Sequence, residues 1–165
     1  YLGKLYHGKD ELTEEEYDLS KKITFNLIYG GITDDVRDNV PFMPRIADFV
    51  DETWNFYKQN GYIETWFYNR KLKSSIFDNK TNSYKVFNYL LQSAETERNC
   101  LVLKNIFEYL NDKTTQCILY TYDAFLFDVC KKEKEDIKDI LKIFEKYKLK
   151  VKIKHGDSYD FTERD

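Results

Sequence analysis

Four side chains near the start of the sequence combine a cation with aromatic rings at a regular spacing of four residues: Tyr17, Lys21, Phe25 and Tyr29. On a helix, this spacing places them along one stripe. The stripe suits a ligand that carries phosphate and a flat base, with Lys21 on the phosphate and Phe25 and Tyr29 stacked on the base or sugar. The alternative is an amphipathic helix whose lysine extends past aromatic residues of the core.

A second candidate is Asp123, which lies between two runs rich in β-forming residues, 116–122 and 124–129. This pattern predicts a strand, a turn and a second strand, with the acid at or near the tip. An aspartate in such a turn is ordinarily a turn former. A carboxylate on a rigid hairpin is also a suitable oxygen ligand for a hard divalent cation.

A third group of polar residues lies between these two positions in the sequence. Asn88 and Gln92 are four residues apart and therefore share one face of a predicted helix. Arg70 and Lys71 belong to a segment, 56–90, in which basic residues outnumber acidic ones, although the net charge of the whole chain is −3. Taken alone, each of these signals is also typical of a solvated surface.

The elements that must position these residues can be predicted from capping signals and periodicity. Thr13 and Glu16 have the spacing of a capping box, which begins a helix that we expect to end at Gly30-Gly31. A second helix is predicted over 45–60, with these side chains turned inward: Ile46, Phe49, Val50, Phe56 and Tyr57.

The rest of the sequence predicts a mixture of helices and short strands. Two strands are expected over 62–67 and 70–76, a long helix over 83–110, a charged helix over 134–147 and a half-buried strand over 149–153. Together with the hairpin around Asp123, these elements predict an α+β fold that is helix-rich with a small antiparallel sheet.

Three segments, in the correct order, resemble the family A (bacterial DNA polymerase I-like) DNA polymerases. Residues 21–30 (KKITFNLIYG) look like motif B of the fingers helix, K-x-x-x-F-G-x-x-Y-G, and residues 120–129 (YTYDAFLFDV) look like motif C of the palm, V-H-D-E-L-V-F-E-V. Residues 88–94 (NYLLQSA) are similar to the palm helix between them. Weaker similarities at 61–65 (GYIET) and at Gly156 with Tyr159 extend the resemblance over most of the chain.

The resemblance implies that residues 1–165 are a single C-terminal portion of a right-hand polymerase, with fingers helices over about 10–60 and palm over about 61–165. By this resemblance Lys21 holds the phosphates of an incoming dNTP, Phe25 packs on its sugar and base, and Tyr29 closes the pocket beside the templating base. Tyr17 belongs to the same nucleotide-binding stripe. The residues implied to contact primer–template DNA are Asn88, Gln92, Arg70, Lys71 and Tyr122.

The resemblance also implies two Mg²⁺ ions, with Asp123 as a metal ligand and, together with Lys21, as a catalytic residue. The second aspartate of the family lies on a palm strand upstream of the fingers, and residues 1–12 offer only Asp10 and Glu11 outside its motif. Because the sequence begins at Tyr1 and its only Met is Met43, we expect a trimmed or processed product or a piece of a longer protein. We expect that strand and the thumb to lie in the preceding polypeptide, and the chain alone to be inactive.

The sequence departs from the family pattern at four positions: Tyr17 replaces an Arg, Asn26 a Gly, Tyr122 a His and Ala124 an acid. Two alternatives stay open. One is a portion of a phage-type single-subunit RNA polymerase, which shares the K…Y-G helix and the metal-binding palm, although Phe25, where that group tends to have Met, and residues 92–94 favour DNA synthesis. The other, which the departures at Tyr17, Tyr122 and Ala124 keep open, is a non-catalytic nucleic-acid-binding remnant of a polymerase.

Composition bears on location and source. No stretch approaches the roughly 18 apolar residues of a membrane span, so no membrane partner is expected. Three cysteines without C-x-x-C spacing favour a reduced, cytoplasmic compartment. The abundance of Lys, Asn, Ile and Tyr suggests an AT-rich genome, such as that of a phage or virus.

Overall fold

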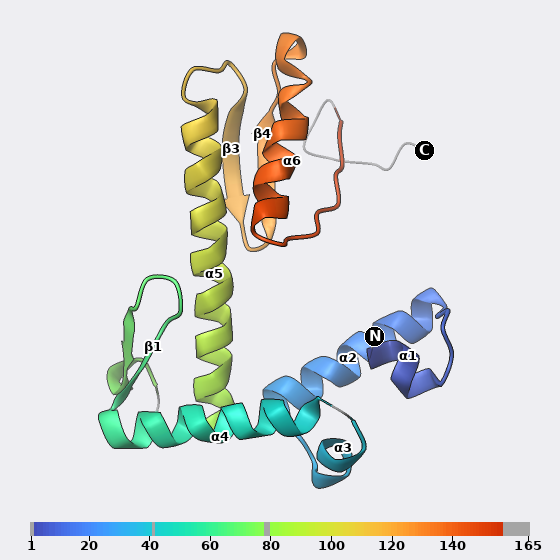
Figure 1. Cartoon of the computed structure of the whole chain (residues 1–165), viewed down its shortest axis with the longest axis vertical. Helices are drawn as coiled ribbons and strands as arrows, with labels where there is room; N and C mark the ends of the chain where they lie inside the picture. Colours follow the sequence, from blue (N-terminus) through green and yellow to red (C-terminus); the bar gives the residue numbers. More distant parts are fainter. Residues whose placement is uncertain (1, 41, 78–79, 157–165) are drawn as a thin grey trace. The chain divides into compact units, whose positions relative to one another are not determined.

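The computed structural model describes residues 2–40, 42–77 and 80–156 (Figure 1). The chain divides into two compact units, residues 1–95 and 96–165. The helix α5 (Ser83–Leu110) begins in the first unit and ends in the second. The division between fingers and palm near residue 60 stays a prediction.

The first unit is mostly helical. Its elements besides the start of α5 are α1 (Leu2–His7), α2 (Glu14–Gly30), α3 (Asp34–Asn39), α4 (Met43–Asn60), the strands β1 (Tyr62–Glu64) and β2 (Lys71–Lys73), and the 3-10 turn η1 (Ser74–Ile76). The strands pair in antiparallel fashion, with Ile63 opposite Leu72. Both side chains are buried and pack in one core with Phe77, Val86 and Leu90.

The second unit is a hairpin packed on two helices. After the end of α5 it contains β3 (Gln116–Thr121), β4 (Ala124–Asp128), the 3-10 turn η2 (Lys131–Glu133) and α6 (Asp136–Lys146). The partly buried Phe125 and Phe127 of β4 pack against a core from the two helices: Val102, Ile106, Leu110, Ile140 and Phe144. Phe125 meets Phe144 edge-on, with 5.1 Å between ring centroids.

The predicted fold class is confirmed: the chain is α+β, helix-rich with small antiparallel sheets. The capping box at Thr13 forms as expected, and the long helix over 83–110 has the predicted ends. The prediction for 62–76 was right in kind but too long, because η1 follows β2 directly and each strand has only three residues.

Two packing predictions were wrong. Phe56 was expected inward, but its side chain is 43% exposed and meets Tyr62 edge-on at the surface, and Phe49 is only partly covered. The strand expected over 149–153 does not form within the described residues, where neither sheet pairs with this segment and Val151 and Ile153 are exposed. Alternation with lysines therefore did not indicate a buried face.

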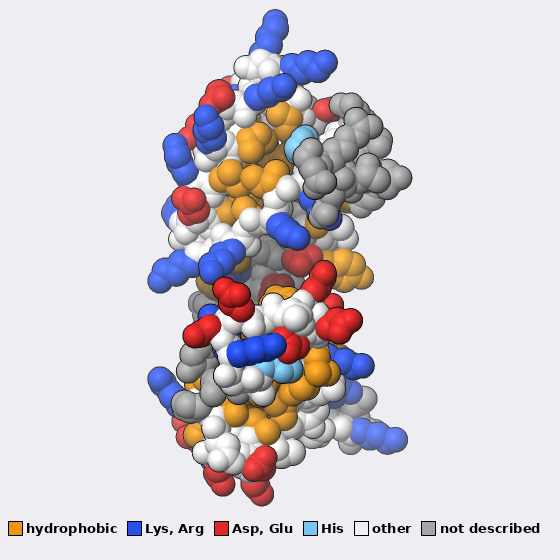
Figure 2. All heavy atoms as spheres, turned by 90° about the vertical axis from the view of Figure 1, so that its right-hand side faces the viewer, with side chains coloured by type: hydrophobic (Ala, Val, Ile, Leu, Met, Phe, Trp, Pro, Cys, Tyr) orange, Lys and Arg blue, Asp and Glu red, His pale blue; other side chains and the backbone are white. Residues whose placement is uncertain are grey.

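Hydrophobic side chains also reach the surface of each unit on the face drawn in Figure 2. No helix in the described part of the chain combines the length and the apolar character needed to cross a membrane.

Candidate functional sites

The predicted stripe on α2 lies at the surface. Tyr17, Phe25 and Tyr29 are 59%, 44% and 42% exposed, and Lys21 is exposed between them. The Lys21 Nζ atom lies 6.0 Å from the centroid of the Phe25 ring, and the rings of Phe25 and Tyr29 are 5.6 Å apart with an interplanar angle of 31°. The aromatic residues therefore do not belong to the core, which removes the main argument for a purely structural stripe.

The N-terminal end of α2 is fixed by a capping box with an added ion pair. The Thr13 amide donates to Glu16 Oε2 at 2.8 Å, and the Glu16 amide donates to Thr13 Oγ1 at 3.3 Å. Lys9 Nζ lies 2.6 Å from Glu16 Oε1, and this contact is the main reason that the pKa of Glu16 is lowered to about 2. The charge of Glu16 also suits the positive end of the helix.

A different side of α2 from the stripe packs closely on α1. Ser20 is 4% exposed, and a Cβ atom built on Gly3 would lie 3.0 Å from Ser20 Oγ and 2.5 Å from Leu12 Cδ1. The absence of a side chain at Gly3 thus allows the two helices to approach. This packing holds one side of α2 and leaves the stripe in solvent.

The C-terminal end of α2 is held by two side chains from α5. The Ile32 amide donates to the hydroxyl of Tyr84 at 2.9 Å, and Asn88 Nδ2 lies 3.5 Å from the carbonyl oxygen of Tyr29. Asn88, a predicted DNA contact, is therefore partly buried beside the end of the stripe, whereas Gln92 is exposed on the same helix. Sequence reasoning missed Tyr84, although its position one turn before Asn88 could have indicated a shared face.

The predicted basic pair, Arg70 and Lys71, is exposed at the start of β2. Lys71 Nζ lies 3.7 Å from Glu64 Oε1 and 4.3 Å from the centroid of the Tyr62 ring. The Arg70 amide donates to Thr65 Oγ1 at 3.0 Å, which fixes the backbone at this point. Both cations thus lie at the start of β2 and are exposed to solvent.

The turn of the hairpin in the second unit presents Asp123 to solvent. Tyr122 has a φ of 52° and is 90% exposed, and Asp123 beside it is exposed as well. Asn99 of α5 is 6% exposed, and its Nδ2 donates to the Tyr122 carbonyl oxygen at 3.3 Å. Sequence reasoning missed Asn99, whose hydrogen bond joins the turn to α5 and so fixes the backbone next to Asp123.

Asp123 fits the role of one carboxylate ligand of a hard cation, because it is exposed on a fixed turn. It does not form a complete site with its neighbours. Within residues 2–40, 42–77 and 80–156, no group of three or more His, Cys, Asp or Glu side chains could hold a metal ion.

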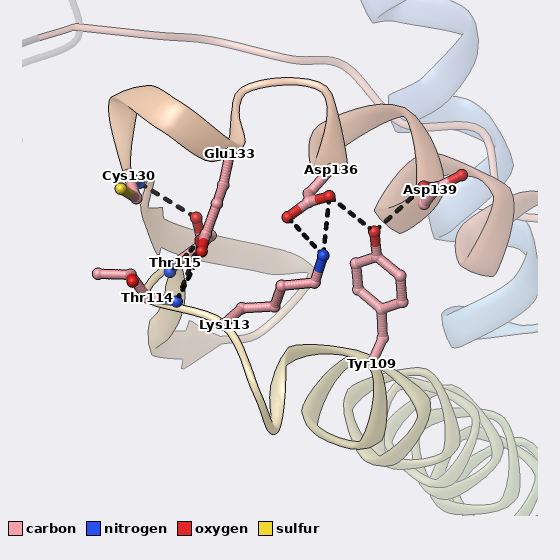
Figure 3. Close-up of polar contacts among 8 residues, drawn as sticks. All are labelled: Tyr109, Lys113, Thr114, Thr115, Cys130, Glu133, Asp136 and Asp139. Carbon is pink, nitrogen blue, oxygen red and sulfur yellow. Dashed lines mark hydrogen bonds and ion pairs between the residues drawn. The ribbon is translucent and has the colours of Figure 1, made fainter.

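The base of the hairpin is fixed by Glu133, which follows β4 and reaches back to the start of β3 (Figure 3). Its carboxylate accepts the amides of Thr114, at 3.0 and 3.1 Å, and of Thr115, at 2.7 Å. These bonds lower the pKa of Glu133 to about 2. The Thr115 hydroxyl in turn accepts the Cys130 amide at 3.1 Å, which joins the two ends of the hairpin.

A second set of contacts ties α6 to the end of α5 (Figure 3). The hydroxyl of Tyr109 lies 3.0 Å from Asp136 Oδ1 and 3.1 Å from Asp139 Oδ2, and Lys113 Nζ lies 3.0 Å from Asp136 Oδ2. Burial and the two adjacent carboxylates raise the pKa of Tyr109 above its ordinary value. Contacts within the cluster account for these groups, so we assign it a structural role in joining α6 to the end of α5.

Comparison with known proteins gives a fold and no sequence family. No protein-family model matches the chain, and no curated protein sequence matches it. Among solved structures it is similar to the polymerase domain of Pol1 from M. smegmatis, determined in complex with a DNA primer-template and dNTP. The two are 15% identical with a TM-score of 0.69, over 88% of this chain and 30% of that chain.

A likeness at this level of identity shows the fold alone. The chain spans about 30% of the length of the Pol1 chain. This likeness shows that the chain has a polymerase-like fold.

Tyr159, which belongs to the weaker C-terminal similarity, lies outside the described residues.

Proposed function

We propose that this chain is the fingers-and-palm portion of a family A DNA polymerase and takes part in template-directed addition of dNTPs to a primer 3′-hydroxyl. The single observation that carries the proposal is the exposed stripe on α2, in a chain whose fold is that of a polymerase domain. A helix with a solvent-facing lysine among aromatic rings has the chemistry to bind a nucleotide.

In this proposal the nucleotide is bound by the stripe. Lys21 pairs with the phosphates, for which its compact positive charge is suited, and Phe25 packs on sugar and base. Tyr29 closes the pocket beside the templating base, and its backbone is held by Asn88. Tyr17 stands where the family has an arginine and offers a hydroxyl and a ring in place of a second phosphate contact.

Asp123 supplies a carboxylate for the metal in this proposal, and the second carboxylate comes from polypeptide outside this chain. Two Mg²⁺ ions, when bound, would activate the primer 3′-hydroxyl and stabilise the departing pyrophosphate. The contribution of this chain is to hold the Asp123 carboxylate on a turn that Asn99 fixes from behind.

The contacts with primer–template DNA are assigned to Gln92, Arg70, Lys71 and Tyr122, all of which are exposed, and to the partly buried Asn88. An amide side chain in the minor groove meets acceptors at similar positions in every correct pair, so Asn88 and Gln92 would check geometry without reading sequence. Contacts of Arg70 and Lys71 with phosphates release counterions, so duplex binding should weaken as salt is raised.

The stripe can be tested by comparing two adjacent lysines of α2. Lys21→Ala should weaken dNTP binding by roughly tenfold or more, because charge-assisted bonds to phosphate are lost. It should change duplex binding much less. Lys22→Ala is the matched control, since it removes the same charge from a neighbouring exposed position, and it should leave dNTP affinity close to that of the unmodified chain.

Both affinities can be measured by titration calorimetry. Equal losses of dNTP and duplex affinity in Lys21→Ala would count against the assigned role, as would an equally strong effect of Lys22→Ala. Repeating the titration with NTPs tests the RNA polymerase alternative. A clear preference for NTPs over dNTPs would favour that alternative.

One observation favours a second candidate function, a non-catalytic nucleic-acid-binding part of a polymerase. Ala124 stands where the family has an acid, and Asp123 has no ligand cluster around it among the described residues. This candidate predicts DNA binding without any Mg²⁺-dependent incorporation, even in a protein that carries the second carboxylate.

A further inference from the structure

The connection between β1 and β2 carries three consecutive aromatic residues that are not absorbed by the proposed nucleotide site (Figure 1). Trp66, Phe67 and Tyr68 are 51%, 41% and 47% exposed. Asn69 follows them with a φ of 50° and reverses the chain. We call Trp66, Phe67 and Tyr68 the aromatic loop.

The ends of the aromatic loop are fixed. Thr65 is 2% exposed, its amide donates to the Arg70 carbonyl oxygen at 3.0 Å, and its hydroxyl accepts the Arg70 amide at 3.0 Å. Ile63 and Leu72, two pairs further along the sheet, lie in the core. The exposed rings are therefore presented by a rigid base.

Trp66 is supported by a chain of ring contacts that leads into the core. Its ring centroid is 6.1 Å from that of Phe49, which in turn is 5.9 Å from Phe87 at an angle of 76°. Phe87 is 5% exposed. The indole is thus held in place while half of it faces solvent, which is the arrangement that a stacking surface needs, because little freedom is lost when a ring is added on top.

Cations follow the aromatic loop in the sequence. Arg70 comes just before β2, Lys71 and Lys73 lie on it, and all three are exposed. The one acid on the paired strand, Glu64, lies 3.7 Å from Lys71, and both side chains are about half exposed, so solvent screens this pair and Lys71 remains available. Lys71 also lies over the Tyr62 ring, at the outer edge of the same sheet. Within residues 62–73 the exposed rings are therefore accompanied by three cations and one acid.

We propose that the aromatic loop, with Arg70, Lys71 and Lys73, binds an unpaired DNA strand, with bases stacked on Trp66 and its neighbours and phosphates on the cations. Exposed rings interleaved with cations bind single strands without sequence preference, since every base has a π-face. In a duplex the base faces are already covered by stacking, so the exposed rings should contribute no affinity there. The positive charge argues against an apolar protein partner. The choice of DNA over RNA rests on the proposed function.

Because the chain has only two tryptophans, binding at Trp66 can be followed by tryptophan fluorescence once the other is replaced. Trp54 is half-buried and stacked on Tyr57 at 5.5 Å, so Trp54→Phe keeps a ring in that position and leaves Trp66 as the only indole. Titration of this variant with oligo(dT) of roughly 10 nucleotides, without metal or dNTP, should quench its fluorescence saturably. The quenching should weaken as salt is raised.

Affinity is then compared between matched variants with a labelled oligo(dT). Trp66→Leu should weaken binding by roughly tenfold, because one stacking partner is lost. Phe107→Leu removes a ring that is 52% exposed in the other unit and should have no effect. Arg70→Gln with Lys71→Gln should weaken binding and reduce its dependence on salt. Circular dichroism checks that each variant is folded.

Absence of quenching in the Trp54→Phe variant would overturn the proposal, as would equal affinities in Trp66→Leu and Phe107→Leu. A loss of blunt-duplex affinity in Trp66→Leu as large as its loss of oligo(dT) affinity would also overturn it. Tighter binding of oligo(rU) than of oligo(dT) would overturn the choice of DNA. The Lys21→Ala variant should bind oligo(dT) with normal affinity. The proposal for the aromatic loop and the proposal for the nucleotide site can therefore be contradicted independently of each other.

Discussion

At the scale of single residues, the stripe on α2 leaves parts of its aromatic side chains in water. Burying a side chain of the size of Phe stabilises by about 1.5–3 kcal/mol, yet Phe25 and Tyr29 are more than two-fifths exposed. Lys21 lies between Tyr17 and Phe25 along the stripe and discourages closure of the rings against a partner helix. A bound nucleotide would cover the rings and neutralise the lysine together.

Glu133 gives a prediction at the same scale, because one carboxylate holds the amides on which the hairpin begins. Its pKa is about 2, below its ordinary value of 4.5, so the charged form is the one that stabilises the fold. That stabilisation is fully present above about pH 4.5 and is lost as the pH falls toward about 2. Protection of the Thr114 and Thr115 amides from hydrogen exchange, corrected for intrinsic rates, should fall over this window.

Glu133→Gln should lower the protection of these amides at pH 7 and remove most of its decline between pH 5 and 3. Glu135→Gln is the control, since the Glu135 side chain is 83% exposed and pairs with the exposed Lys138. Its protection pattern should match that of the unmodified chain. If the decline with pH persisted unchanged in Glu133→Gln, the role given to this carboxylate would be wrong.

At the scale of elements, the end of α2 requires a backbone conformation that side chains disfavour. Gly31 has φ 127° and ψ 139°, whereas Gly30 lies in the helix and has open space around it. A Cβ atom on Gly31 would meet the Tyr84 ring at an ordinary 3.5 Å, so the obstacle there is the backbone angle and not a collision. The two adjacent glycines therefore have different physical roles.

This difference predicts opposite effects for the same substitution. Gly31→Ala should destabilise the protein by about 1–3 kcal/mol because alanine strains that conformation. Gly30→Ala should be neutral or stabilise by up to about 1 kcal/mol, because alanine favours the helix. Thermal unfolding monitored by circular dichroism measures both. Equal losses of stability would contradict the account of the helix end.

The sequence predicted those elements whose signals are local. The capping box at Thr13, the long apolar periodicity over 83–110 and the turn at Tyr122-Asp123 each depend on a few neighbouring residues, and each was confirmed. The exposure of Phe56 and the unpaired segment 149–153 depend on which element lies opposite, and periodicity does not carry that information.

The same limit applies to the site. Lys21, Phe25 and Asp123 could be selected from residue type and spacing, and their exposure agrees with a binding role. Tyr84 and Asn99, which hold the ends of these sites, act across distances of 52 and 23 residues in the sequence. Such partners become visible only when the fold brings them together.

At the scale of the whole molecule, the proposed nucleotide and metal ligands belong to different compact units: Lys21 to the first and Asp123 to the second. The proposal requires both units to act on the same nucleotide. It also requires a second carboxylate beside Asp123, and the described residues hold no group of three or more His, Cys, Asp or Glu side chains that could bind a metal ion. Catalysis, rather than binding, is therefore the property that tests the whole account.

The most direct measurement is incorporation of a single dNTP on a primer–template with Mg²⁺, by this chain alone and by a protein in which a palm strand with a second carboxylate precedes it. The account predicts no extension by the chain alone and extension by the completed protein. Asp123→Ala should abolish this extension, whereas Asp128→Ala, at the exposed end of β4, should retain it. Extension that survives Asp123→Ala would contradict the account, as would a completed protein that binds primer–template and never extends it.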